Sequence, residues 1–537
     1  MKSSSHIFAM FGIVLGLVFM STQGWAAAAP ETLSREAGQW WADIAAIADD
    51  STEGRLTGSR GYLRAADYVM SRFKAEGLQP AGVKGYLQPI AFEQQIVDQS
   101  ASTGELVSAD GSATPLRIGE DALIPAGGAR RPPQIDAPLV FIGYGLHLPG
   151  QGHDDFEGID VKDKIAIVLS GGPADVPGTI KASARFERTA LLGRLGAVGI
   201  LSLTTPHQIE IPWARQKLLA RQPGMYLADA SLRDTPDNFF SANIDPDKAE
   251  LLFKGSGHSF AELCALADAS AILPRFILPQ HIRATVAASY ESLSSPNLVA
   301  SLKGSDRQLA SQFVAVSAHL DHLGVGAPAD GGRIFSGAMD DASGVAAVLD
   351  IAHRLKKASH HPRRSILFII FTAEEKGLLG SHYFASRPTV PRSSIVAELN
   401  FDMPLPLWPL KGVLAQGDGE STLGADARAV AQERNLTLVP DPLPNRNSFT
   451  RTDQFSFVRE GIPALAFKFG FAKDTPEFQI EHDWRAMRYH SPEDNLQQPG
   501  VLKEEAVKLD AFVAALALRV ANEDARPEWL PTSVFRK

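Results

Sequence analysis

The stretch Phe313-Val-Ala-Val-Ser-Ala-His-Leu-Asp-His322 joins a run of apolar residues directly to polar, metal-binding residue types. Its first six residues predict a buried strand, because short apolar runs bounded by polar residues are typical of such strands. Further elements of the same kind follow along the chain: strands at 365–371, 395–400 and 464–469, and helices at 342–357 and 501–522. This alternation predicts an α/β fold with a mostly parallel central sheet flanked by helices on both faces.

Metal-binding residue types lie at the ends of these predicted strands, before a predicted helix and in a turn-like segment near the C-terminus. The candidates are His319, Asp340, Glu374, Glu375, Asp402 and His490. Ligand sites of open parallel sheets lie beyond the carboxyl ends of the strands. We therefore expect these six side chains to meet at one edge of the sheet, although they are far apart in sequence.

The mixture of imidazoles and carboxylates indicates binding of divalent metal ions. His319, Asp340, Glu375, Asp402 and His490 would supply two imidazoles and three carboxylates, enough for two divalent ions that share one bridging carboxylate. Asp340, directly before a predicted helix, is well placed to be that bridge. A donor set without thiolate fits Zn²⁺, with Co²⁺ or Mn²⁺ as alternatives. Glu374 would be left over as a base for hydrolysis, so the sequence predicts a co-catalytic metallohydrolase.

Each candidate also has a structural explanation. Asp341 and Ser343 are good helix N-caps, and acidic residues such as Glu374 near a helix start favour the helix dipole. A lone histidine at a strand end is more often structural, and we interpret His322 in that way. Asp321 would lie on the same side of the extended segment as His319 and would orient its ring. Structural explanations for all the candidates would require several independent coincidences, which favours the metal site.

These segments resemble a known family. His319-Leu-Asp321, Gly337-Ala-Met-Asp-Asp-Ala-Ser-Gly344, Glu374-Glu375, Asn400-Phe-Asp-Met403 and Tyr489-His-Ser-Pro-Glu493 are similar to the signature segments of the co-catalytic zinc exopeptidases, which include bacterial leucyl aminopeptidases and glutamate carboxypeptidase. The resemblance covers roughly residues 295–522, and the segment 53–61 is similar to the family's N-terminal part. Residues 141–145 and 155–160 resemble the protease-associated domain that is often inserted in this family.

The resemblance implies a site and a reaction. One Zn²⁺ would take His319, Asp340 and Asp402, and the other Asp340, Glu375 and His490. Glu374 would be the general base and Asp321 would orient His319. Some relatives use a tyrosine downstream of the fourth ligand to stabilise the oxyanion, and that tyrosine is missing here, because none lies between 403 and 488. Tyr489 and Arg451 are the candidates to replace it.

Composition and the N-terminus place limits on location and partners. The net charge of −9 and the lack of a basic stripe exclude a nucleic-acid footprint. Residues 1–29 resemble a signal peptide: Lys2, an apolar stretch shorter than the ~20 residues that span a bilayer, and four alanines. With one cysteine, Cys264, no internal disulfide forms, which favours a bacterial periplasmic or secreted protein without stable membrane insertion. The sequence does not indicate an oligomeric state.

The expected organisation is a signal peptide at 1–29, an N-terminal part of the peptidase domain at 30–100, an inserted β-rich protease-associated domain at 101–283 and the zinc peptidase domain at 284–537. An aminopeptidase acting on peptides is the leading hypothesis. A carboxypeptidase or dipeptidase of the same family stays open. A glutaminyl cyclase-like enzyme or a non-catalytic binding homologue ranks lower, because the ligand set is complete.

Overall fold

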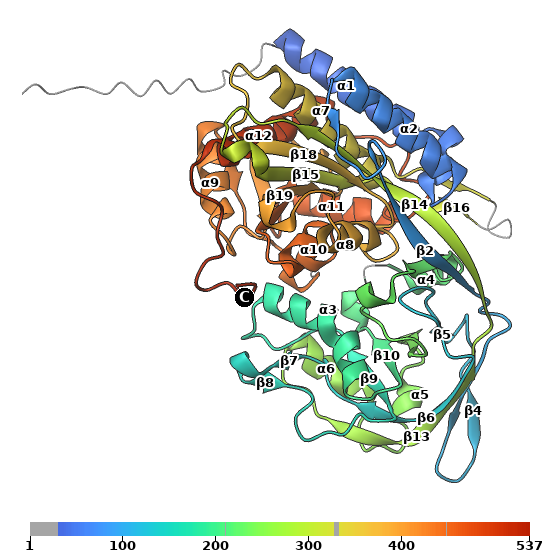
Figure 1. Ribbon diagram of the computed structural model, residues 1–537. Helices are drawn as coiled ribbons and strands as arrows, with labels where there is room; N and C mark the ends of the chain where they lie inside the picture. Colours follow the sequence, from blue (N-terminus) through green and yellow to red (C-terminus); the bar gives the residue numbers. More distant parts are fainter. Residues whose placement is uncertain (1–29, 210, 327–331, 447, 537) are drawn as a thin grey trace, which may run out of the picture.

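The computed structural model describes residues 30–209, 211–326, 332–446 and 448–536. The predicted signal peptide, residues 1–29, lies outside the described residues. Two large sheets organise the chain. Figure 1 shows the larger sheet with helices packed against it and the smaller sheet beyond it, the two being joined along the long strands β2 (Leu87–Val97) and β14 (Ala288–Leu302).

The centre of the larger sheet is parallel. Its strand order is β11-β2-β14-β18-β15-β19-β22-β20-β21, and the four strands from β18 to β22 in this order are mutually parallel. Their bounds are β15 Phe313–His319, β18 Ser365–Phe371, β19 Ile395–Phe401 and β22 Ala464–Phe469. Every residue of β18 and β19 is buried, as expected for strands covered on both faces. The predicted fold class is confirmed.

The parallel centre is joined to the strands on either side by antiparallel pairs, which the sequence did not indicate. β14 pairs antiparallel with both β2 and β18, and β22 pairs antiparallel with β20. β2 and β14 mix buried and exposed positions along their length, so no continuous apolar run marks them. The remaining strands are β1 Gln79–Pro80, β11 Gly224–Leu227, β20 Gly412–Gln416 and β21 Thr437–Leu438.

Helices cover both faces of the sheet. Alternate residues of β18 enter different cores: Ile366, Phe368 and Ile370 pack in one, and Leu367, Ile369 and Phe371 in the other. The first core is closed by α1 Pro30–Ile47, α2 Arg60–Ala75, α7 Ser343–Lys357, α9 Leu423–Glu433 and α12 Lys503–Asn522, and the second by α8 Leu379–Ser386 and α10 Gln454–Arg459. The two-residue alternation of the strand therefore fixes a three-layer arrangement.

The smaller sheet has eight strands in the order β4-β3-β13-β6-β9-β10-β12-β5, with its own apolar core. The strands are β3 Thr103–Val107, β4 Ala113–Pro115, β5 Ala122–Leu123, β6 Gln134–Phe141, β9 Ile165–Leu169, β10 Gly199–Leu203, β12 Phe240–Ile244 and β13 Phe276–Thr285. The helices of this part are α3 Gly178–Arg194, α4 Trp213–Leu219, α5 Glu250–Phe253 and α6 Phe260–Asp268, and β7 His147–Leu148 pairs with β8 His153–Asp154. One strand from the same stretch of chain, β11, pairs instead with β2 of the larger sheet.

Two smaller elements complete the peptidase part: β16 Gly324–Val325 pairs with β17 Ile334–Phe335, and α11 is Pro476–Met487. Cys264 is a half-buried free thiol on α6. Within the described ranges, none of the helices has both the length and the apolar character required to cross a bilayer.

Candidate metal centre

The parallel strands deliver the candidate side chains to one edge of the larger sheet. β15 ends at His319, which lies in register with Phe371, the last residue of β18. Glu374 and Glu375 follow β18 by a short turn, and Asp402 directly follows β19. The strands end together, so residues more than 50 positions apart share one site.

Asp340 lies at the centre of the cluster. Its Oδ1 is 3.3 Å from His319 Nε2, and its Oδ2 is 3.4 Å from His490 Nε2. The same His490 nitrogen is 3.0 Å from Glu375 Oε2. One carboxylate thus presents an oxygen to each of two histidines, which is the arrangement that a bridging ligand requires.

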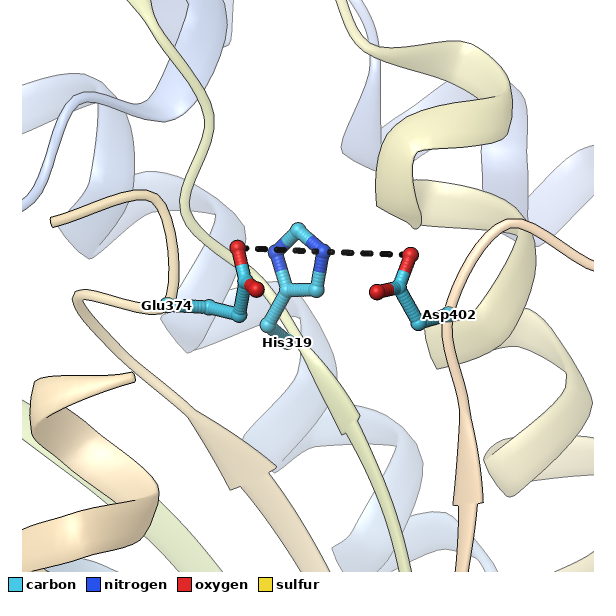
Figure 2. A group of neighbouring side chains, drawn as sticks. All are labelled: His319, Glu374 and Asp402. Atoms are coloured by element: carbon cyan, nitrogen blue, oxygen red, sulfur yellow. Dashed lines mark ion pairs between the residues drawn. The ribbon is translucent and has the colours of Figure 1, made fainter. Parts of the chain in front are cut away.

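Among the described residues, two groups of three side chains are close enough to hold a metal ion: His319, Glu374 and Asp402, and His322, Asp340 and Glu375. Figure 2 shows the first group, with the imidazole of His319 between the carboxylates of Glu374 and Asp402. His319 Nε2 is 3.9 Å from Glu374 Oε2 and 4.0 Å from Asp402 Oδ1. The structure therefore brings together all six residues expected from the sequence, and it adds His322.

The interpretation of His322 as a histidine outside the site was wrong. Its ring is fully buried, with Nδ1 2.7 Å from Glu375 Oε1 and 3.9 Å from Asp340 Oδ2. Glu375 consequently has a histidine on each oxygen, His322 on Oε1 and His490 on Oε2. The spacing His319-Leu-Asp-His322 turns the chain back toward the site after the strand ends, which strand alternation alone did not predict.

The donor set fits divalent cations. His319 Nε2, His322 Nε2 and Asp340 Oδ2 are buried and have no hydrogen-bond partner among the described residues. Buried polar atoms are nearly always satisfied, and buried carboxylates are costly unless they are paired or bind a metal. Nitrogen and oxygen donors that lack protein partners and face the same space are what one or two bound ions would satisfy.

The surroundings shift the pKa values of the clustered carboxyl groups in opposite directions. Burial alone would raise the pKa of Asp340, but the imidazoles of His319 and His490 beside its two oxygens hold that pKa well below its ordinary value. Burial likewise opposes ionisation of Glu375, and the charges and hydrogen bonds of His490 and His322 lower its pKa. For Glu374, burial together with the negative charges of Asp402 and Glu375 raises the pKa well above its ordinary value. Glu374 is thus a carboxyl that readily carries a proton.

Asp321 contacts the site differently from the expectation. The ring nitrogen Nδ1 of His319 lies 3.1 Å from the backbone oxygen of Asp321, and the Asp321 carboxylate turns elsewhere. It accepts hydrogen bonds from the backbone nitrogens of Glu374 (3.0 Å) and Glu375 (3.3 Å) and from the hydroxyl of Thr57 (3.0 Å). Asp321 therefore fixes the turn that carries both glutamates.

Asp494 is a positioning residue that the sequence analysis missed. It is fully buried, and its carboxylate accepts hydrogen bonds from the backbone nitrogens of Met339 and Asp340, each at 3.0 Å, and from Gln498 Nε2 at 2.8 Å. Asp341 Oδ1 similarly accepts from the backbone nitrogens of Gly344 and Met403. Two buried aspartates thus hold the backbone on either side of the Asp340 side chain.

Arg55 connects the N-terminal part of the chain to the site. Its guanidinium is fully buried and donates to the backbone oxygens of Leu320 (2.7 Å), Ser336 (2.6 Å) and Gly337 (3.0 Å). Burial lowers its pKa to about 10, while the nearby negative charges of Asp494 and Asp340 oppose that shift. Arg55 therefore ties the segment after His319 to the segment before Asp340, and it remains a cation at neutral pH.

Cavities lined by described residues adjoin the cluster. One, of about 490 Å³, is lined by Glu375 and His490 and by apolar residues that include Ile211, Leu219 and Leu323. Another, of about 50 Å³, is lined by Asp340, Glu374 and Asp402 and by Arg451 and Tyr489, the two candidates for stabilising an oxyanion.

The stretch that contains the smaller sheet also contacts the site. Arg215 of α4 donates to the backbone oxygens of Tyr489 (3.0 Å) and Ala486 (2.6 Å). It thereby supports the turn that carries His490, whose ring stacks on Tyr489 with centroids 3.9 Å apart.

Comparison with known proteins agrees with this geometry. Residues 297–513 match the model of peptidase family M28. A probable leucine aminopeptidase 2 of Aspergillus fumigatus is 30% identical over 262 residues, 46% of this chain and 48% of that protein. Aminopeptidase YwaD of Bacillus subtilis is 28% identical over 228 residues, 41% of this chain and 45% of that protein. The alignments thus span about half the length of these two relatives.

Carboxypeptidase Q of Bos taurus is 30% identical over 183 residues, 34% of either chain. Among solved structures, the aminopeptidase from Aneurinibacillus sp. strain AM-1 superposes with a TM-score of 0.53 at 20% identity, covering 94% of this chain and 97% of that one. The structural likeness supports the fold.

Proposed function

We propose that the chain is an exported di-metal exopeptidase, acting as an aminopeptidase that hydrolyses N-terminal residues from peptides. The observation that carries the proposal is the placement of Asp340, with one carboxylate oxygen toward His319 and the other toward His490. The peptidase names of the matched relatives, and the match of residues 297–513 to the model of peptidase family M28, support it. Export to the periplasm or exterior rests on residues 1–29, and the expected boundaries near 101 and 283 define the proposed inserted protease-associated domain.

The ligand assignment that we propose follows the cluster. His319, Asp340 and Asp402 would hold one ion, and Asp340, Glu375 and His490 the other, with zinc favoured by the donors. His322, 2.7 Å from the second oxygen of Glu375, would orient that carboxylate. Two such ions, when bound, would lower the pKa of water toward ~7 and polarise the scissile carbonyl.

Glu374 is the proposed general base. It would take the proton of the attacking water and pass it to the leaving amine. Its side chain lines the small cavity and is 11% exposed, more than those of Asp340, Glu375 or Asp402, at 4, 5 and 9%. A carboxyl that remains accessible and readily accepts a proton suits this role better than that of a permanent ligand.

The test compares two substrates on the zinc-loaded mature protein. An aminoacyl-p-nitroanilide has a free amino terminus, whereas an N-acylated dipeptide has a blocked amino terminus and a free carboxyl terminus. We expect turnover of the first substrate and little of the second. Turnover of the blocked dipeptide alone would replace the aminopeptidase by a carboxypeptidase of the same family.

A further inference from the structure

His490 differs from the other proposed ligands in how its backbone is held. His319 is the last residue of β15 and Asp402 directly follows β19, so the larger sheet fixes both of them. His490 instead lies in a turn that follows the end of α11 at Met487, and its φ angle of 51° is in the left-handed region. A residue with a side chain adopts that region only at a cost in free energy, so contacts from its surroundings must hold it there. The position of this ligand therefore depends on the groups that fix its turn.

Arg215 fixes this turn by two hydrogen bonds. Its Nη2 donates to the backbone oxygen of Ala486 at 2.6 Å, and its Nη1 donates to that of Tyr489 at 3.0 Å. The Ala486 oxygen is one of the last four of α11, which have no partner within the helix, and a cation is favourable at such an end. The Tyr489 oxygen belongs to the rigid peptide group that precedes His490, so holding it restrains the rotation that φ of His490 measures. One guanidinium group thus holds both ends of the turn.

Arg215 comes from a distant part of the chain. It lies on α4, within the stretch from β3 to β13 that contains the smaller sheet (Figure 1). Trp213 Nε1 attaches α4 to that stretch by donating to the backbone oxygen of Glu120 at 2.8 Å, and Lys217 Nζ lies 2.9 Å from Glu120 Oε2. Both anchors are on the same helix as Arg215, so a displacement of that stretch would withdraw the guanidinium from the turn.

The same helix approaches the metal centre from one side. Gln216 and Leu219 of α4 line the cavity of about 490 Å³ together with Glu375 and His490. His319 and Asp402 are not among the described residues that line this cavity. α4 therefore lies beside the ligands of one proposed ion.

We propose that Arg215 is a positioning residue of the metal centre, which makes the ion held by Glu375 and His490 depend on the docking of α4. The ion held by His319 and Asp402 does not depend on it, because the larger sheet fixes those two ligands. The inference rests on the proposed ligand assignment. It is independent of the kind of peptide that is cleaved.

The affinity of the mature chain for zinc tests the inference. R215Q removes the cation and its forked donors, whereas R215K keeps the charge and can donate to one of the two oxygens. K217Q is the matched control, because it removes a cation of the same helix that pairs with Glu120 and not with the turn. The affinity for each zinc ion is measured by competition with a chelator, and circular dichroism melts of the metal-free proteins verify that the variants are folded.

We expect R215Q to bind one zinc ion as the unaltered protein does and the other about 10- to 100-fold more weakly, the usual loss when a group that orients a ligand is removed. R215K should recover part of that loss, and K217Q should bind both ions with unchanged affinity. In H490A, which lacks the ligand itself, adding R215Q should leave the affinity for the remaining ion unchanged, because the effect of Arg215 passes through His490. Should R215Q fail to fold, the same selective loss, smaller in size, is expected in R215K.

Unchanged affinity for both ions in the Arg215 variants, or equal weakening of both, would overturn the inference. A further loss when R215Q is added to H490A would overturn it as well, because a general loss of stability has that effect. The outcome is separable from that of the proposed function. Fewer than two zinc ions in the unaltered protein would refute the proposed di-metal site and this inference with it. Two ions that depend unequally on Arg215, without turnover of any peptide, would refute the peptidase alone.

Discussion

Replacing Glu374 by glutamine separates the two roles that its position allows. Glu374 belongs to a possible metal-binding group with His319 and Asp402, yet it is also the expected proton carrier. Glutamine keeps the shape and one oxygen, but it does not accept a proton at neutral pH. A proton carrier would thus be disabled with the site otherwise intact, whereas a metal ligand would lose its charge.

The size of the loss in kcat depends on which of the two roles Glu374 has. Glu374 Oε2 lies 3.9 Å from His319 Nε2, about as far as the proposed ligand oxygen Asp402 Oδ1 at 4.0 Å, so this distance fits either role. The raised pKa of Glu374 and its place in the lining of the small cavity favour the proton carrier. General acid–base catalysis is worth about 10²- to 10⁴-fold, so kcat should fall by that factor, or about 3–5 kcal/mol in activation free energy.

The assay combines turnover of an aminoacyl-p-nitroanilide with zinc content per chain. We expect E374Q to retain the zinc of the unaltered protein and to lose activity through kcat, with little change in KM. The exposed Glu528→Gln serves as the control and should leave both quantities unchanged. Loss of one zinc in E374Q would make Glu374 a ligand, and unchanged kcat would remove it from the mechanism.

Three further predictions concern residues around the ligands. His322→Ala should weaken binding of one of the two zinc ions about 10- to 100-fold in a competition titration with a chelator, because His322 holds Glu375; unchanged affinity would return His322 to a packing role. Asp494→Asn should lower the free energy of unfolding in urea by about 1–3 kcal/mol, because the backbone nitrogens of Met339 and Asp340 share its two oxygens; an unchanged midpoint would contradict this. Burial raises the pKa of Asp453 to about 7, above its unfolded value of about 4, so its contribution to stability is complete below pH ~4 and is lost as the pH rises to ~7. In the metal-free protein Asp453→Asn should abolish up to about 4 kcal/mol of this decline, and parallel pH profiles of the two proteins would refute the linkage.

The part of the fold that could be predicted from the sequence is the part marked by local patterns of apolar and polar residues. The strands that end at His319 and before Asp402 are mostly apolar and fully or almost fully buried, and the parallel arrangement follows from their alternation with helices. The antiparallel flanks were missed because β2 and β14 have mixed burial along their length. The pairing of β11 with β2 depends on contacts between distant parts of the chain, which no local signal records.

The candidate site also has residues that the sequence predicted and residues that it did not. The six candidate side chains could be predicted from their metal-binding residue types and from their positions at strand ends, before a helix or in a turn. Asp494, by contrast, acts on the backbone of Asp340, 154 positions away, and Arg55 acts on Ser336 and Gly337. Their contribution is to hold a backbone shape, so neither residue type nor spacing distinguishes them from surface charges. The sequence signal was their position: Arg55 lies in the segment 53–61, and Asp494 directly follows the signature segment 489–493.

The central claim is that Asp340 is shared between two cations. Zinc content per chain, measured by elemental analysis after dialysis against zinc-buffered solution, tests it in the unaltered protein and in Asp340→Ala. We expect about two zinc ions per chain in the first and the loss of both in the second, since each would lose a ligand. One zinc or none in the unaltered protein, or two zinc ions retained in Asp340→Ala, would contradict the account.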